Sequence, residues 1–112
     1  MTIFQKILDG EIPAHVVYED ERVLAFRDIH PAAPVHVLII PRKPLIDVRA
    51  AEEEDALLLG HMILVSREVA RREGVLESGY RLVINNGTDA GQEVFHLHLH
   101  VMGGARLGGL AG

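Results

Sequence analysis

The chain has 112 residues, 48% of them hydrophobic, and its 16 acidic against 11 basic side chains give a formal net charge of −5. The length suits one domain over 1–112, and the apolar content supplies a core and argues against disorder. Lys and Arg are scattered along the chain, which argues against a nucleic-acid partner. No apolar run is long enough to span a membrane, and the lack of cysteine excludes disulfides and Cys-based sites. Without the pattern of a secretory signal, we expect a cytoplasmic protein.

The first part of the chain predicts a short helix and three strands. Apolar residues recur with helical spacing over 3–8. Two short apolar runs, 16–18 and 23–26, flank an acidic turn and predict a hairpin. The β-branched run 35–40 predicts a central strand that is buried on most of both faces.

A long helix is predicted over 52–73, with acids at its start and arginines near its end, as the helix dipole favours. Its middle is apolar around nearly the whole circumference, although a surface helix needs one apolar stripe. We therefore expect this helix to lie in a homodimer interface, with His61 at or near it. The alternative is a helix covered by its own domain.

The last third predicts two strands, 80–85 and 95–101, joined as an antiparallel hairpin by a loop rich in turn formers. The glycine-rich stretch over about 104–112 predicts an irregular tail. The second strand reads F-H-L-H-L-H-V. Because a strand sends alternate side chains to opposite faces, its three histidines should line one face and its apolar residues the other: His96, His98 and His100 against Phe95, Leu97, Leu99 and Val101.

Three aligned imidazoles could bind a metal, perform phosphorus chemistry, or lie hydrogen-bonded in a core. Metal-binding histidines usually have a carboxylate nearby, and Glu93 is the one acid close in sequence. A neutral imidazole is a good nucleophile toward phosphorus, and a second can carry the proton. Because the loop at Gly91 brings backbone N–H groups toward the strand for negative oxygens, we favour phosphorus chemistry.

The segment N-N-G-T-D-A-G-Q-E-V-F-H-L-H-L-H-V-M-G-G, residues 85–104, resembles the signature of the histidine triad (HIT) family. Its two glycine-containing pairs, Gly91-Gln92 and Gly103-Gly104, are similar to the bacterial type of the histidine triad nucleotide-binding branch, and so are T-I-F-Q-K-I-L-D-G-E-I-P and A-F-R-D-I-H-P. The resemblance implies an α+β fold with an antiparallel sheet of about five strands, one long and one short helix, and a two-fold dimer whose sheets join across the interface.

The same resemblance implies a purine nucleoside phosphoramidase. Such a hydrolase cleaves the P–N bond of adenosine or guanosine 5′-phosphoramidates, releases AMP or GMP, and requires no metal or cofactor; family members also hydrolyse aminoacyl adenylates. The alternative is a module that binds AMP or GMP and acts through partners with little turnover.

Carried over by position, the resemblance makes His98 the nucleophile that becomes nucleotidylated, His100 a phosphate contact that assists proton movement, and His96 a support that orients His98. Asp28 would accept hydrogen bonds from the ribose hydroxyls, unless it simply caps the next turn. The other implied nucleotide-binding residues form an apolar slot for the purine and a group around the phosphate and leaving group: Phe4, Ile7, Ile12, Phe26 and Ile29, then Asn85, Gly91, Gln92 and Glu93.

Three departures from animal members put the leaving-group preference in doubt. Pro44 follows Pro41-Arg42-Lys43 where they carry a fourth histidine, so we expect the triad to lack this further imidazole. Glu93 stands in place of a serine, and the C-terminal tryptophan is missing. We expect Glu93 to offer its backbone N–H and to turn its carboxylate away from the phosphate. The remaining histidines have simpler interpretations: His36 as a hydrogen-bonded core residue, His15 and His30 as solvated turn residues.

Overall fold

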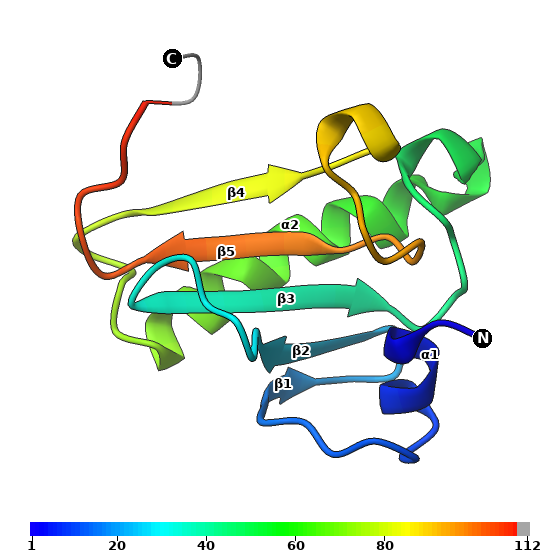
Figure 1. The fold of residues 1–112 in the computed structure, drawn as a ribbon, viewed down its shortest axis with the longest axis horizontal. Coiled ribbons are helices and arrows are strands. Elements are labelled where there is room, and N and C mark those ends of the chain that lie inside the picture. The colour runs from blue at the N-terminus through cyan, green and yellow to red at the C-terminus, as the bar shows by residue number, and fades with distance from the viewer. Residues whose placement is uncertain (110–112) are drawn as a thin grey trace.

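The computed structural model describes residues 1–109, so the end of the predicted tail, residues 110–112, lies outside the described residues. Figure 1 shows a five-stranded antiparallel sheet in the order β1-β2-β3-β5-β4, which confirms the predicted α+β class. Within this part of the chain, no helix is long and apolar enough to cross a membrane. The elements are α1 (Ile3–Leu8), β1 (Val16–Glu19), β2 (Val23–Arg27), β3 (Val35–Pro41), α2 (Ala56–Arg72), β4 (Tyr80–Ile84) and β5 (Leu99–Gly103), with 3-10 turns η1 (Val48–Ala50), η2 (Glu53–Asp55) and η3 (Thr88–Ala90).

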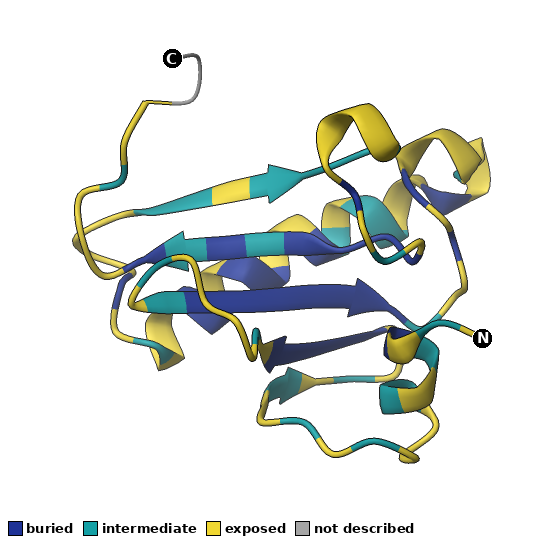
Figure 2. Ribbon diagram, in the orientation of Figure 1, coloured by how far each residue is buried: buried dark blue, intermediate teal, exposed yellow. Residues whose placement is uncertain are grey.

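The sheet is covered on both faces, and its two central strands supply both apolar clusters. Alternate residues of β2 and β3, such as Val37 and Ile39, join Met62 and Val65 of α2 on one face. The intervening residues, such as Leu38, pack with Phe4 of α1 on the other. The colouring in Figure 2 shows β3 buried along most of its length, as its β-branched sequence predicts. Because α1 has only six residues, it covers only part of its face of the sheet.

The long helix begins at Ala56, four residues later than predicted. The residues before it form η2, where the backbone N–H of Glu52 donates to Asp55 Oδ2 at 2.9 Å and Lys43 donates to Oδ1 at 2.6 Å. The ring of His61, a residue expected at or near a dimer interface, lies 2.7 Å from Asp20 Oδ2 of the same chain. That contact ties α2 to the β1–β2 turn.

The final strand begins at Leu99, so the prediction of a strand over 95–101 is wrong at its start. Leu99 pairs with Ile39, and the same register places Leu97 opposite Pro41, which has no N–H to donate. The carbonyl of Pro41 accepts instead from the ring of His96 at 2.7 Å. Two of the three histidines therefore precede the strand, and Phe95 is exposed rather than packed with the core.

Candidate active site

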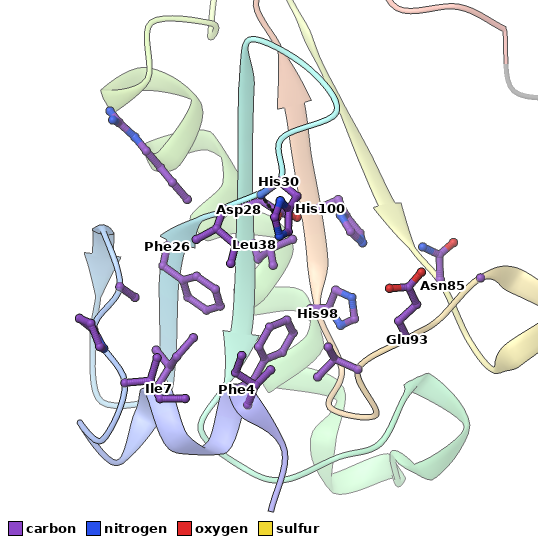
Figure 3. A pocket seen from close by; sticks show the side chains of 18 residues that line it. Phe4, Ile7, Phe26, Asp28, His30, Leu38, Asn85, Glu93, His98 and His100 are labelled. Atoms are coloured by element: carbon purple, nitrogen blue, oxygen red, sulfur yellow. Dashed lines mark hydrogen bonds between the residues drawn. The ribbon is translucent and has the colours of Figure 1, made fainter.

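A cavity of about 440 Å³ lies on the face of the sheet that α1 partly covers. Figure 3 shows aromatic side chains of α1 and β2 on one side of His98, with Asn85 and Glu93 on the other. All of the predicted site residues line this cavity except His96 and Gln92. The lining residues from the prediction are Phe4, Ile7, Ile12, Phe26, Asp28, Ile29, Asn85, Gly91, Glu93, His98 and His100.

The alternation of extended backbone places His98 and His100 on the cavity side. Leu97 and Leu99 point into the cluster under α2, so the histidines between and after them face the opposite way. His100 lies across from Leu38 of β3, which belongs to the α1 cluster. The spacing of the histidines therefore keeps its predicted meaning although the strand itself is shorter.

The hydrogen bonds of His98 define which ring nitrogen can react. Its Nδ1 lies 2.7 Å from the carbonyl oxygen of His96, and a carbonyl can only accept, so Nδ1 carries the proton. In the neutral ring Nε2 therefore holds the lone pair. Phe4 packs edge-on against the ring with centroids 5.1 Å apart, which fixes the plane of the imidazole. The arrangement leaves one basic nitrogen on a buried, oriented side chain.

A second hydrogen-bonded chain sets the tautomer of His100. The backbone N–H of Ala32 donates to His36 Nδ1 at 3.0 Å, so the proton of a neutral His36 resides on Nε2. That Nε2 lies 2.9 Å from His100 Nδ1, which must accept. His100 consequently carries its proton on Nε2, a buried atom without a hydrogen-bond partner in the described chain. An unpaired buried donor is costly, so this N–H has a hydrogen bond that it can still make.

Burial keeps these imidazoles neutral. It lowers the pKa of His100 to about 4, and the neighbouring His98 and His36 rings act in the same direction. Burial also lowers the pKa of His36, against the pull of Asp28, and that of His96. At neutral pH the free site therefore offers the neutral N–H donor of His100 beside His98, with the two ring centroids 4.9 Å apart.

His96 and Gln92, the two predicted site residues outside the cavity lining, hold the segments that form the cavity in place. The ring of His96 is 2% exposed and its Nε2–H donates to Pro41, so the segment that carries the His96 carbonyl is held in place. The Gln92 amide is buried too: its oxygen accepts from Gly87 N at 2.7 Å and its NH₂ donates to the Ile46 and Val94 carbonyls. Gln92 therefore fixes the loop, and the structure does not place its side chain around a phosphate.

Asp28 combines both of the interpretations that its sequence context allows. Its Oδ1 accepts from His30 N at 2.9 Å, which caps the turn, while Oδ2 lies 3.5 Å from His36 Nε2 and borders the cavity. Asp28, His36 and His100 offer three ligand atoms within 4.8 Å of one another, a spacing that a metal ion could use. Two of those atoms already share a hydrogen bond, so a metal would have to displace its proton.

His36 is the functional residue that the sequence reasoning missed. The expectation that the triad lacks a further imidazole is wrong. The imidazole of His36, on β3, contacts His100, whereas Pro44 lies exposed in the loop after β3. The sequence contained a signal for this role. His36 and Leu38 are two residues apart and so lie on the same face of their strand, and the strand predicted as central had to lie near the histidines.

The Glu93 carboxylate, expected to turn away from the phosphate, lies at the cavity beside Asn85 in Figure 3.

Comparison with known proteins gives consistent results. The family model described as "HIT domain" matches residues 9–107. The "14 kDa zinc-binding protein" of Zea mays is 52% identical over 108 residues, covering 95% of this chain and 84% of its own. Two solved structures also match: a HIT family hydrolase from Clostridium thermocellum (46% identity, TM-score 0.95, covering 98% and 96% of the two chains) and a histidine triad nucleotide-binding protein from Candida albicans (32%, 0.82, 90% and 73%).

Proposed function

Because this chain belongs to the HIT domain family, whose relatives include hydrolases, we propose that it hydrolyses the P–N bond of purine nucleoside 5′-phosphoramidates. The observation that carries the proposal is the pairing of a free Nε2 on His98 with an unpartnered Nε2–H on His100 in one cavity. The first is a nucleophile for phosphorus, and the second is a donor for a phosphoryl oxygen.

The reaction proceeds in two displacements. The lone pair of His98 Nε2 attacks phosphorus, the P–N bond breaks, and the departing nitrogen takes up a proton and leaves as an amine. His98 then carries the nucleotide through a P–Nε2 bond. A water oxygen attacks the same phosphorus, loses its proton, and returns the electron pair to Nε2, which releases the nucleoside monophosphate. His100 supports both displacements, since a bound phosphate anion raises the pKa of that imidazole toward neutrality and suits it to proton transfer.

The rest of the cavity fits the other parts of a nucleotide. The apolar side, with Phe4, Ile7 and Phe26, suits the faces of a purine ring. The Asp28 carboxylate is an acceptor for the vicinal hydroxyls of a ribose. Asn85 lies on the side of His98 away from Phe26, and Asn85 and Gly91 line the same cavity and suit the phosphate. The histidine triad nucleotide-binding relative from Candida albicans is consistent with such a ligand.

A steady-state assay with a fluorogenic adenosine phosphoramidate tests the proposal. We expect turnover by the wild type, loss of at least about 10³-fold in His98→Ala, and near-normal rates in His15→Ala, whose imidazole is exposed outside the cavity. Mass spectrometry of protein quenched during turnover should find one added nucleotide on His98. Near-wild-type hydrolysis by His98→Ala would refute the mechanism.

The second candidate is a nucleotide-binding module with little turnover, which the same nucleotide-binding relative also supports. Such a module would use the same cavity. This candidate predicts tight AMP or GMP binding with negligible hydrolysis in the same assay. Isothermal titration of AMP beside the turnover measurement separates the two candidates, because an enzyme releases this product and regenerates the free site on every cycle.

We also propose a cytoplasmic homodimer. The outward side of α2 leaves the apolar side chains of Leu57, Ile63 and Leu64 at 80%, 51% and 54% exposure, and a second copy would cover them. The edge strand β4 offers unpaired backbone groups for joining two sheets. A chain without cysteine suits the reducing cytoplasm. Light scattering at micromolar concentration should give the mass of two chains, and a clean monomer would refute the dimer.

A further inference from the structure

Glu93 places a carboxylate at the cavity that the two displacements do not use. The backbone on both sides of it is fixed, because the buried Gln92 amide donates to the Val94 carbonyl and accepts from Gly87. Glu93 itself is exposed, and no ion pair to it is found among residues 1–109. Figure 3 shows it with Asn85, on the side of His98 away from Phe26.

The cavity does not balance this negative charge. Arg27 is the one permanent cation among the lining residues that the structure describes, and its guanidinium donates two hydrogen bonds of 2.9 Å to Glu73. Asp28 adds a second carboxylate to the wall. A phosphoryl group beside His98 therefore meets two carboxylates and no free guanidinium or ammonium, so a cation brought by the substrate gains electrostatic energy here.

The chemistry tells which part of the substrate reaches Glu93. In an in-line displacement the leaving group departs from the side of phosphorus opposite the attacking His98 Nε2. With the purine on the apolar side beside Phe4 and Phe26, the amine extends along the other side of the cavity, where Asn85 and Glu93 lie. Glu93 then faces substituents of the amine rather than the base.

We propose that Glu93 determines leaving-group specificity by selecting amines that carry a second, positively charged group, such as diamines or basic amino acids linked through one nitrogen. The inference rests on the proposed phosphoramidase function and concerns the part of the substrate that this function leaves open. The carboxylate offers the cation a partner at an exposed position, so the effect is moderate, weakens with salt, and acts on both binding and turnover.

Three adenosine 5′-phosphoramidates of equal chain length test the proposal. Their amines are 1,3-diaminopropane, n-butylamine and 4-aminobutyrate, whose distal groups are cationic, neutral and anionic. We expect wild-type kcat/KM to favour the diamine over butylamine by about fivefold and to disfavour the aminobutyrate. The diamine preference should shrink toward unity in Glu93→Gln, reverse in favour of the aminobutyrate in Glu93→Lys, and persist in Glu77→Gln, an exposed acid outside the cavity.

Binding separates this inference from the proposed function. The same conjugates are titrated into His98→Ala protein, which cannot cleave them, with and without Glu93→Gln. A diamine preference that depends on Glu93 supports the inference even if wild type shows no turnover, an outcome that would refute the phosphoramidase function alone. Equal preference ratios in wild type and Glu93→Gln, by binding and by turnover, would overturn the role of Glu93 while leaving butylamine hydrolysis as support for the enzyme.

Discussion

Hydrogen bonds at single residues decide what each imidazole can do. A neutral histidine whose Nδ1 donates to a carbonyl, as that of His98 does, has its lone pair at Nε2. A histidine whose Nδ1 accepts, as in His100, must present a proton there. The same side chain type thus suits two different roles in the proposed reaction, nucleophile and donor, at ring centroids 4.9 Å apart, and the difference comes from the carbonyl of His96 and the ring of His36.

Replacing His36 by Phe should impair the reaction without removing the nucleophile. Phe keeps the aromatic volume but leaves His100 Nδ1 unpartnered, so the His100 proton is no longer confined to Nε2. We expect kcat to fall about 10- to 100-fold with a smaller change in KM. Nitrogen NMR of labelled histidine should show His100 redistributed between tautomers. An unchanged His100 spectrum would contradict the hydrogen-bonded chain from Ala32 through His36 to His100. The control is His30→Phe, which introduces the same ring at an exposed position of the cavity lining.

Metal removal should leave the proposed activity intact, whereas added zinc should inhibit it. The cluster of Asp28, His36 and His100 can accept an ion only by losing the proton shared between the two rings, which the reaction needs. We therefore expect EDTA to leave kcat/KM within about twofold, and zinc inhibition to weaken at least about tenfold in His36→Phe. Activity lost with EDTA and restored by zinc would instead make the cluster a catalytic metal site.

At the scale of elements, the loop between β4 and β5 determines how the phosphate end of the cavity is built. It is longer than a hairpin turn and it folds back through η3, with Gly91 closing that turn at φ +91°. Its interior is a single buried amide, Gln92, which bonds to three backbone groups of two separate segments. Gly91 and Glu93, on either side of Gln92, face the cavity because Gln92 faces inward.

The substitution Gln92→Met tests this role of the loop. Methionine fills similar space but leaves Gly87 N–H and the carbonyls of Ile46 and Val94 without their partner. We expect unfolding in urea to show a loss of about 1–3 kcal/mol, and KM to rise more than kcat falls. Thr88→Val, an exposed change in the same loop, should alter neither by more than about 0.5 kcal/mol or twofold. Equal effects of both substitutions would contradict a specific role for the amide.

Periodicity predicted most elements because it reflects burial by neighbouring layers. The continuous β-branched run in 35–40 and the helical spacing in 3–8 correspond to β3 and α1 as observed. The start of β5 could not be predicted, because it depends on which residue of β3 lies opposite Leu97, and that register is tertiary. The contact between His36 and His100 is also tertiary, since the two residues are 64 positions apart, although the face of the strand on which His36 lies could be predicted from its spacing with Leu38.

At the scale of the molecule, the sheet separates two layers of unequal size. One face packs against the whole of α2, whereas the other is shared by the short α1 and the cavity. The proposed catalytic groups therefore lie on or directly before a strand whose opposite face packs against α2. The outward side of α2 remains apolar, which is the basis for expecting a second copy there.

Charging the outward side of α2 should separate the proposed dimer. We expect Ile63→Glu with Leu64→Glu to convert a dimer into a monomer at micromolar concentration, because two carboxylates per chain would be buried without partners. The control is Glu53→Gln, an exposed change before the helix. Sedimentation velocity reports the mass, and circular dichroism checks that the monomer keeps its fold. A double variant that stays dimeric would place the interface elsewhere.

Stability should fall as the pH is lowered from about 7 to about 5, because the buried histidines resist protonation. The pKa of His100 is lowered from 6.5 to about 4 on folding, chiefly by burial, and those of His36 and His96 are also lowered. The unfolded chain therefore binds more protons in this range. The acids with lowered pKa, such as Glu68 and Asp20, start from 4.5 and 3.8 and lose their contribution below this range.

The melting temperature of wild type should accordingly decrease steadily across this range, and less steeply in His100→Gln, which has no imidazole to protonate at that position. His15→Gln, at an exposed site, should keep the wild-type slope. Scanning calorimetry at several pH values measures all three slopes. A wild-type slope of zero, or equal slopes in His100→Gln and wild type, would show that burial does not hold His100 neutral, and its Nε2–H would then lose its assignment as a neutral donor.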